Sequence, residues 1–257
     1  MTANTVTIRQ DARPGNSTGS RLDARGMSYL GGAAALLVVT TALAEILITF
    51  LPGGYTTAGT VVEWFALLQN SPFLGLRNLG LLNIVMVACE IPLVLALYWA
   101  HRKTSPALAA LATILALVGT AVFYATNRAL PMLSLSAQWA SAGGEAERAM
   151  LEAAGQAMLA VGQSHTPGTF LAFFFSEIAG ILMAVVLLRG KLFSRAAALA
   201  GLGGYSFLLV YEVFASFAPS THEAILVLAM LGGLANIAWY ILVAARFYQL
   251  AKDDAVL

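Results

Sequence analysis

Four glutamates lie inside long apolar runs of the sequence, where an acidic side chain is costly to keep. They are Glu45, Glu90, Glu177 and Glu212. No Lys, Arg or His accompanies them within the apolar cores of these runs. An ionised carboxylate far from water costs several kcal/mol, so such residues usually face the interior of a helix bundle, where they bind ions or carry protons.

The surroundings of these acids limit their chemistry. Four ionised carboxylates in one place repel one another, so we expect some of them to be protonated at neutral pH or paired with a cation. Basic residues near the ends of the runs are Arg77, Arg128, His165 and His222, and polar residues within the runs are Asn83, Tyr124, Asn127, Ser176, Tyr211, Asn236 and Tyr240. From these residues we predict a ligand- or ion-binding set of Glu45, Glu90, Glu177, Glu212, Arg77, Arg128, Asn83, Asn127, Asn236 and Tyr211. The alternative is structural, because a neutral glutamate can be hydrogen-bonded across helices and contribute about 1 kcal/mol.

Motifs for other chemistries are missing from the sequence. It contains no HExxH, no G-x-S-x-G, no P-loop and no GxGxxG at a strand-to-helix turn. The apolar runs offer no His as an axial haem ligand, and we expect His165 and His222 to be loop residues. One cysteine, Cys89, cannot form a disulfide within the chain. We therefore predict no cofactor and assign no catalytic or metal-binding residue.

The chain is too apolar for a soluble domain. Of its 257 residues, 59% are hydrophobic and 11% are charged, whereas about a quarter of a soluble domain is charged. The mean hydropathy is +0.79. A net charge of +1 argues against a nucleic-acid binder, which would need a basic patch. The excess apolar surface must be taken up by lipid.

Six segments are long and apolar enough to cross a bilayer, which requires about 20 residues each. They are Met27–Leu51, Gly80–Ala100, Ala107–Asn127, Thr169–Leu188, Ala196–Phe217 and Ala224–Val243. Each must be helical, because an open strand in lipid leaves backbone groups unpaired. The sequence thus predicts an all-α, polytopic transmembrane bundle of about six spans.

The chain divides into three predicted parts. Residues 1–26 form a disordered cytoplasmic tail, residues 27–250 form the transmembrane helical domain, and residues 251–257 form a cytoplasmic C-terminal tail. The first apolar run is too long for a signal peptide and ends without an A-x-A cleavage pattern, so we expect it to be retained as the first span.

Two long connections contain further predicted helices. Val61–Leu68 is typical of a short interfacial helix, with Trp64 and Phe65 at the level of the lipid headgroups. Glu145–Val161 has apolar positions at helical spacing, which predicts an amphipathic extracytoplasmic helix between spans three and four. We expect this helix to lie on the membrane surface or to pack on the bundle.

Basic residues fall mainly on one side of the predicted membrane. With a cytoplasmic N-terminus, eleven of the 14 Lys and Arg residues are cytoplasmic, and the outer segments hold only Arg77, Arg128 and Arg148. This distribution follows the positive-inside rule and places both termini in the cytoplasm.

The orientation gives each glutamate an approximate depth. A helical rise of about 1.5 Å per residue places Glu212 about 7 Å, Glu45 about 9 Å, Glu177 about 12 Å and Glu90 about 15 Å from the outer ends of their helices. All four lie in the outer half of the membrane. We therefore expect one acidic cluster near the extracytoplasmic side.

Two stretches carry a family resemblance. The first is Asn127–Ser136 (NRALPMLSLS) with the Ala/Met-rich segment that ends near Val161, and the second is Gly168–Ile181 with the Leu187-Leu188-Arg189 and Lys191–Ser194 segments that follow. Together with the six apolar runs, they make the chain resemble a bacterial family of multi-pass membrane proteins known as a domain of unknown function. The resemblance covers most of residues 27–250. It implies a bacterial cytoplasmic membrane protein with this topology, and it implies no reaction.

Three functions remain open at this point. The first is binding or transport of a small ligand, a cation or protons at the glutamates, with the outer arginines balancing charge. The second is a membrane-embedded enzyme acting on a lipid, with Glu90 or Glu177 as general acid/base and His165 or His222 as its partner. The third is an accessory subunit with a neutral, hydrogen-bonded core. We favour the first, and we expect the lipid bilayer and a small molecule or cation as partners. A homo-oligomer is compatible with all three.

Overall fold

The fold is helical throughout the part of the chain that the computed structural model describes, which is residues 16–51, 59–162 and 165–253. The helices are α1 (Asn16–Phe50), α2 (Val61–Asn70), α3 (Pro72–Asn78), α4 (Leu81–His101), α5 (Pro106–Thr126), α6 (Ala129–Ser141), α7 (Glu145–Ala160), α8 (Phe170–Gly190), α9 (Arg195–Phe217), the 3₁₀ turn η1 (Pro219–Thr221) and α10 (His222–Lys252). The prediction of an all-α protein is confirmed.

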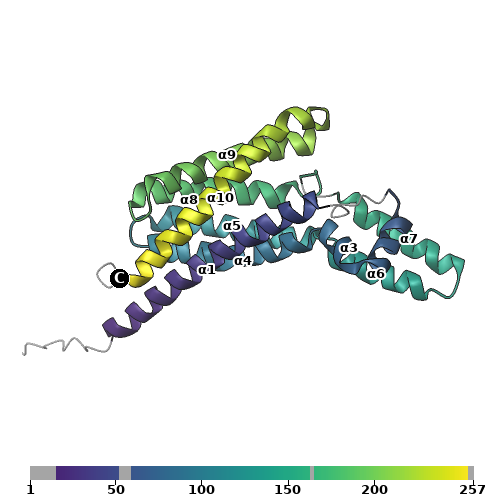
Figure 1. Cartoon of the computed structure of the whole chain (residues 1–257), viewed down its shortest axis with the longest axis horizontal. Coiled ribbons are helices and arrows are strands. Elements are labelled where there is room, and N and C mark those ends of the chain that lie inside the picture. The colour runs from purple at the N-terminus through teal and green to yellow at the C-terminus, as the bar shows by residue number, and fades with distance from the viewer. Residues whose placement is uncertain (1–15, 52–58, 163–164, 254–257) are drawn as a thin grey trace, which may run out of the picture.

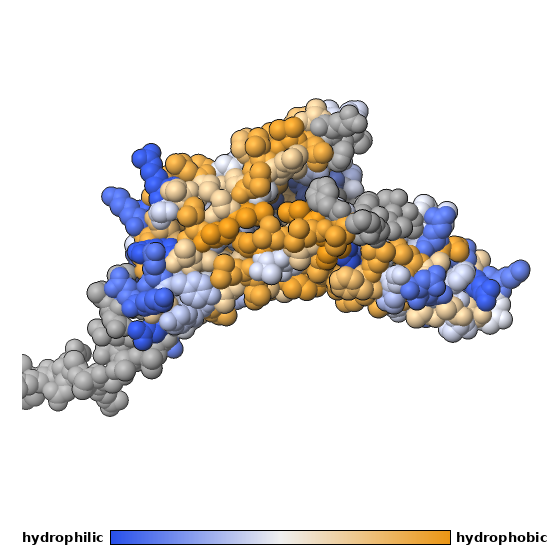
Figure 2. Space-filling model, in the orientation of Figure 1, coloured by the Kyte–Doolittle hydropathy of each residue, from blue (hydrophilic) through white to orange (hydrophobic). Residues whose placement is uncertain are grey.

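Six of these helices are long and apolar enough to cross a membrane, as predicted: α1, α4, α5, α8, α9 and α10. Their outward side chains form a broad apolar belt with polar residues gathered at its two ends (Figure 2). Leu47 and Leu234, for example, are 67% and 65% exposed. Exposure of large apolar side chains on this scale identifies the lipid-facing surface of a multi-pass membrane protein.

The predicted span limits agree closely with the observed helices except at the two ends of the chain. The first helix begins at Asn16 rather than Met27, so the described part of the predicted tail, residues 16–26, is helical. The last helix continues past Val243 to Lys252. Hydropathy marks where lipid contact ends, but a helix can extend further into water because its hydrogen bonds are internal.

The six long helices run side by side along the bundle (Figure 1), and their contacts close into a ring. Each packs against the next in the order α1, α4, α5, α8, α9 and α10, and α10 returns to pack against α1. The two described ends of the chain therefore lie at the same end of the bundle. A buried core that includes Val38, Leu97, Val186 and Val243 fills this half of the ring.

Local sequence signals mark where several of the long helices begin. Gly80 has a φ of +98°, a left-handed conformation that favours glycine, immediately before α4. Proline occupies the first position of α5, where its missing N–H costs no helical hydrogen bond. Ser194 caps α9 by accepting a hydrogen bond from the Ala197 N–H at 3.1 Å.

Four shorter helices, α2, α3, α6 and α7, form a satellite unit at the other end of the bundle (Figure 1). Its own small core consists of Val61, Trp64, Phe65, Leu68, Leu79, Ala129 and Met132. Ser136 Oγ donates to the Phe65 carbonyl at 2.9 Å, and Trp139 Nε1 donates to Glu152 Oε1 at 2.8 Å. The satellite unit is therefore a packed structure rather than a set of separate surface helices.

The satellite unit changes one expectation. A helix is present at Val61–Asn70, and Thr60 and Glu63 form its capping box. However, Trp64 and Phe65 are buried against α6 and α7 instead of lying among headgroups. A helix is also present where Glu145–Val161 was predicted, as α7, with Leu151 buried. Helices α3 and α6 were not predicted as separate elements.

Candidate functional site

The ten residues predicted as a binding set fall into two groups of five at the satellite end of the bundle. Glu45, Arg77, Asn83, Asn127 and Arg128 line one cavity, which we call the outer cavity. Glu90, Glu177 and Glu212 lie on α4, α8 and α9, with Tyr211 on α9 and Asn236 on α10. We call these three glutamates the acidic cluster. Glu90 and Glu212 both lie close enough to Glu177 to act on it electrostatically, whereas Glu45 pairs with Arg77.

Glu45 is held by a buried arginine of the satellite unit. Arg77, on α3, is 2% exposed. Its Nη2 lies 3.0 Å from Glu45 Oε1, and its Nε donates to Glu45 Oε2 at 3.3 Å. The same guanidinium also donates to the Glu45 carbonyl at 3.1 Å and to the Thr49 hydroxyl. Glu45 is therefore neutralised, and this ion pair joins the satellite unit to α1.

The outer cavity has a volume of about 170 Å³ and lies where α1, α3, α4, α5 and the start of α8 meet. Besides the five predicted residues, its lining includes Gly80, Phe123, Gly162 and Thr169. Arg128 is 6% exposed, and its Nη1 donates to the carbonyls of Leu159, at 3.4 Å, and Gly162. The cavity is thus lined in part by polar side chains, and these include two buried guanidinium groups and one carboxylate.

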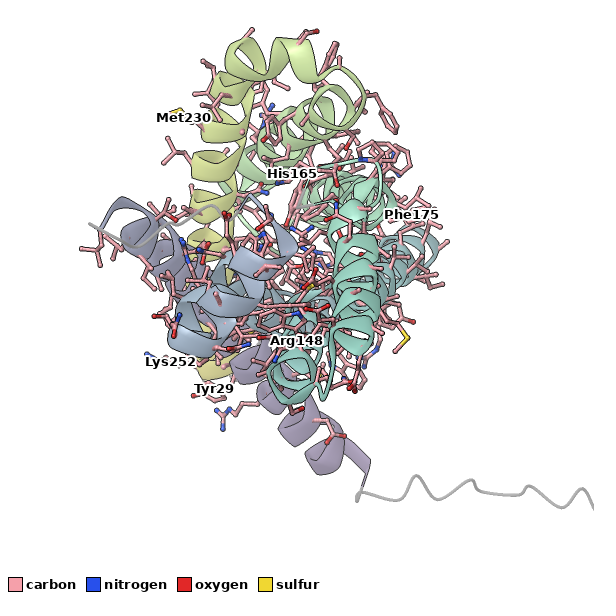
Figure 3. The ribbon with its side chains drawn as sticks, turned by 90° about the vertical axis from the view of Figure 1, so that its right-hand side faces the viewer. Tyr29, Arg148, His165, Phe175, Met230 and Lys252 are labelled. Carbon is pink, nitrogen blue, oxygen red and sulfur yellow. The ribbon has the colours of Figure 1, made fainter. Side chains whose placement is uncertain are left out.

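Glu212 occupies the outermost position of the acidic cluster. It is 1% exposed and lies five residues before the end of α9. His165 Nδ1 is 2.5 Å from Glu212 Oε2, and Ser216 Oγ donates to Glu212 Oε1 at 3.1 Å. His165 also packs against Tyr211, with ring centroids 5.0 Å apart. In the end-on view of Figure 3, His165 lies toward the middle of the molecule, whereas Met230 lies at its margin.

Glu177, on α8, is the central member of the acidic cluster. Its side chain is buried, and its carboxyl lies near both Glu90 and Glu212. Its Oε2 atom is buried without a hydrogen-bond partner among the described residues. An ionised carboxylate so enclosed is energetically costly, and binding of a proton or another cation removes this cost.

Glu90 is the innermost member of the acidic cluster and is bonded to tyrosines. Tyr240, on α10, donates to Glu90 Oε1 at 2.7 Å, and Tyr205, on α9, donates to the Tyr240 hydroxyl at 3.2 Å. Pro92 follows on the same helix, so the Ala88 carbonyl lacks its usual helical donor. Counted from the outer ends of their helices, Glu212, Glu177 and Glu90 lie at depths of about 8, 10 and 14 Å. The three acids are therefore staggered along the bundle.

Asn236 is buried at a close contact between two helices. Its Oδ1 atom has no hydrogen-bond partner in the described part of the chain, and neither does the indole Nε1 of Trp239. A β-carbon on Gly204 would lie 2.1 Å from Asn236 Oδ1, so glycine is required there for α9 to approach α10. Asn236 therefore lies beside the acidic cluster without bonding to it.

One short connection contributes to both groups. In the segment between α7 and α8, Gly162 and Thr169 line the outer cavity, and His165 pairs with Glu212. His165 also packs on Phe173, with ring centroids 4.5 Å apart, and Phe173 packs on Phe123 of the cavity wall. The two groups are thus neighbours across a wall of aromatic rings.

Several contributing residues were not in the predicted set. Thr49, Tyr205 and Ser216 are polar residues one helical turn or one helix away from a glutamate. A search for hydroxyls four residues after each acid would have found Thr49 and Ser216. His222 lies outside the residues whose side chains are described. Within the described residues, no group of three His, Cys, Asp or Glu side chains is placed to hold a metal ion.

Comparison with known proteins places the chain in a family. No curated protein and no solved structure gave a match. The family model that matches is DUF4386, a domain of unknown function, over residues 24–246. This range includes both the acidic cluster and the outer cavity. The chain therefore belongs to the DUF4386 family of domains of unknown function, as a multi-pass membrane protein with six membrane-spanning helices.

Proposed function

We propose that this protein binds and moves protons, or a small cation that competes with them, through the outer half of its helix bundle. The acidic cluster is the pathway, with His165 at its outer end. We also propose that the protein resides in the bacterial cytoplasmic membrane with both termini in the cytoplasm. The observation that carries the functional proposal is Glu177, whose buried Oε2 atom has no hydrogen-bond partner among the described residues and whose carboxyl lies near Glu90 and Glu212.

The spacing of the titratable groups supports a stepwise path. The side chain of His165 is 32% exposed, and it contacts the carboxylate of Glu212, which is 1% exposed. From there the path runs inward through Glu177 to Glu90 and to the hydroxyls of Tyr240 and Tyr205. At each step the proton moves from one protonatable side chain to the next, as proton relays in membrane proteins require.

The inner half of the bundle supports a carrier rather than an open pore. Beyond Glu90, the ring is filled by apolar residues such as Leu97, Val186 and Val243, all at most 1% exposed. Beyond Glu90, a proton therefore meets mainly apolar side chains in the described part of this core. Passage to the cytoplasm would then require a rearrangement of the helices, as in alternating access.

A lipid-acting enzyme is the second candidate, because His165 does contact an acid at the outer end of the bundle. The order of the groups argues against nucleophilic catalysis by serine. In a hydrolase triad the histidine lies between the serine and the acid. Here Ser216 donates to Glu212 itself, and His165 bonds to the other oxygen of the same carboxylate.

Proton flux into proteoliposomes tests the proposal. The purified protein is reconstituted with an internal pH-sensitive dye, and a potassium diffusion potential drives the flux. Wild-type protein should acidify the lumen faster than empty liposomes, and Glu177→Gln should slow this flux by about tenfold or more. Glu145→Gln, at an exposed acid of α7, is the matched control and should retain it. Equal rates for wild type and Glu177→Gln would contradict the proposal and favour an accessory role.

A further inference from the structure

We infer that the outer cavity is a binding site for a small anion with a carboxylate or phosphate group, held by Arg128. This inference goes beyond the proposed proton pathway, because the residues that form the anion site differ from those of the acidic cluster. It rests on the charge, the hydrogen-bond donors and the size of the cavity.

The two arginines of the cavity differ in how their charge is balanced. Arg77 is paired with Glu45 at 3.0 Å. Arg128 is also largely buried, yet no carboxylate among the described side chains pairs with it, and its Nη1 donates to backbone carbonyls only. Its Nε and Nη2 donors make no hydrogen bond within the described part of the chain. A buried guanidinium without a counter-ion is strongly unfavourable, so an anion from outside would complete its surroundings.

The remaining donors of the cavity converge on the same space. Asn127 Oδ1 accepts a hydrogen bond from the Ala129 N–H at 3.0 Å, which turns the amide nitrogen of Asn127 away from that bond. A β-carbon on Gly80 would lie 3.3 Å from Asn127 Nδ2 and 4.0 Å from Asn83 Nδ2. Two amide nitrogens from different elements therefore meet at Gly80, whose lack of a side chain leaves the space between them open. N–H groups arranged in this way match the oxygens of a carboxylate or phosphate.

The volume sets the size of the anion. A cavity of about 150 Å³ in another protein is large enough for benzene, and the outer cavity measures about 170 Å³. The anion site therefore fits a group of up to about eight non-hydrogen atoms, such as inorganic phosphate or a short carboxylate. The same chemistry is present in a phospholipid headgroup, which could enter from the outer leaflet.

Thermal unfolding and calorimetry of the full-length protein in detergent test the anion site. Sodium phosphate and sodium acetate are compared with sodium chloride at equal ionic strength. One of the two oxyanions should raise the Tm of the wild type, because a ligand that binds only the folded state stabilises it. Arg128→Gln should weaken that binding by about tenfold or more, since a charge-assisted pair is lost. Arg148→Gln, at an exposed arginine of the satellite unit, should bind as the wild type does.

A second variant and a second preparation keep the test decisive. If Arg128→Gln does not fold, Asn83→Leu removes one donor and should weaken the same binding while Arg128 remains.

The lipid source is tested in nanodiscs that contain either phosphatidylglycerol or phosphatidylcholine alone. A higher Tm in phosphatidylglycerol that Arg128→Gln abolishes assigns the site to a headgroup, which supports the inference. No effect of phosphate, acetate or phosphatidylglycerol, or equal effects in wild type and Arg128→Gln, would overturn it. Proton flux is a separate readout, so failure of the anion site leaves the Glu177→Gln experiment unaffected.

Discussion

Glu45 and Glu177 have the same side chain at similar depths, yet their environments are opposite. Glu45 shares an ion pair and is 35% exposed, whereas Glu177 is buried with an oxygen atom that lacks a partner in the described chain. A buried polar atom without a partner lowers stability by about 1–3 kcal/mol. Natural proteins tolerate such a cost mainly where the residue is needed for function.

Replacing Glu177 by leucine separates a functional role from a structural one. Glu177→Leu should raise the stability of the protein by about 1–3 kcal/mol, because it removes the unpartnered oxygen and keeps a similar volume. The same variant should show no proton flux above empty liposomes. The measurements are the midpoint of thermal unfolding in detergent and the flux assay. A lower unfolding midpoint would instead identify Glu177 as a hydrogen-bonded structural residue, in agreement with an accessory subunit.

At the scale of the elements, the contact between α9 and α10 depends on two glycines. A β-carbon on Gly201 would lie 2.6 Å from the Trp239 ring, and one on Gly204 would lie 2.1 Å from Asn236 Oδ1. Small residues at the contact between two helices allow their backbones to approach closely in a membrane. The close approach keeps Tyr205 within hydrogen-bond distance of Tyr240, and so supports the inner end of the acidic cluster.

Neighbouring glycines of α9 provide a matched pair of substitutions. Gly204→Ala should destabilise the protein by about 1–3 kcal/mol, because the added methyl group has to displace Asn236. Gly203→Ala, where a β-carbon would meet nothing within 4 Å, should be neutral or stabilising by up to about 1 kcal/mol. Denaturation of both variants in the same detergent is the measurement. Equal effects at the two positions would mean that α9 and α10 do not pack as described.

Sequence patterns predicted the helices better than they predicted which helices pack against each other. The six spans could be found because a lipid-crossing helix needs a long apolar run, which few other structures produce. Helices α3 and α6 were missed because α3 has 7 residues and both are buried partly by other short helices. The depth of each glutamate follows from its position along a helix, but its angular direction depends on which helices are neighbours. This is why Glu45 was expected in one cluster with the other acids and instead pairs with Arg77.

The whole molecule has a ring of long helices with its satellite unit at the end opposite to the chain termini (Figure 1). The predicted orientation places this unit outside the cell, where α7 carries exposed acidic residues such as Glu145 and Glu147. Lys103, in the turn between α4 and α5, is exposed at the other end. The proposed direction of proton entry depends on this orientation.

Cysteine accessibility determines the orientation directly. In a Cys89→Ala background, Glu145→Cys should react with a membrane-impermeant maleimide in intact cells. Lys103→Cys should react only after the cells are permeabilised, because the positive-inside rule places it in the cytoplasm. The reverse labelling pattern would show that the N-terminus and the basic loops lie outside.

The connection between α7 and α8 has a consequence for energetics. Its Gly162 carbonyl accepts from Arg128, and its His165 contacts Glu212, so the two proposed binding events share one segment of backbone. Any free-energy coupling between them must be reciprocal. If an occupied anion site changes the affinity of the His165–Glu212 pair for a proton by some factor, then protonation of that pair changes the affinity for the anion by the same factor. A gradient of either species could then do work on the other.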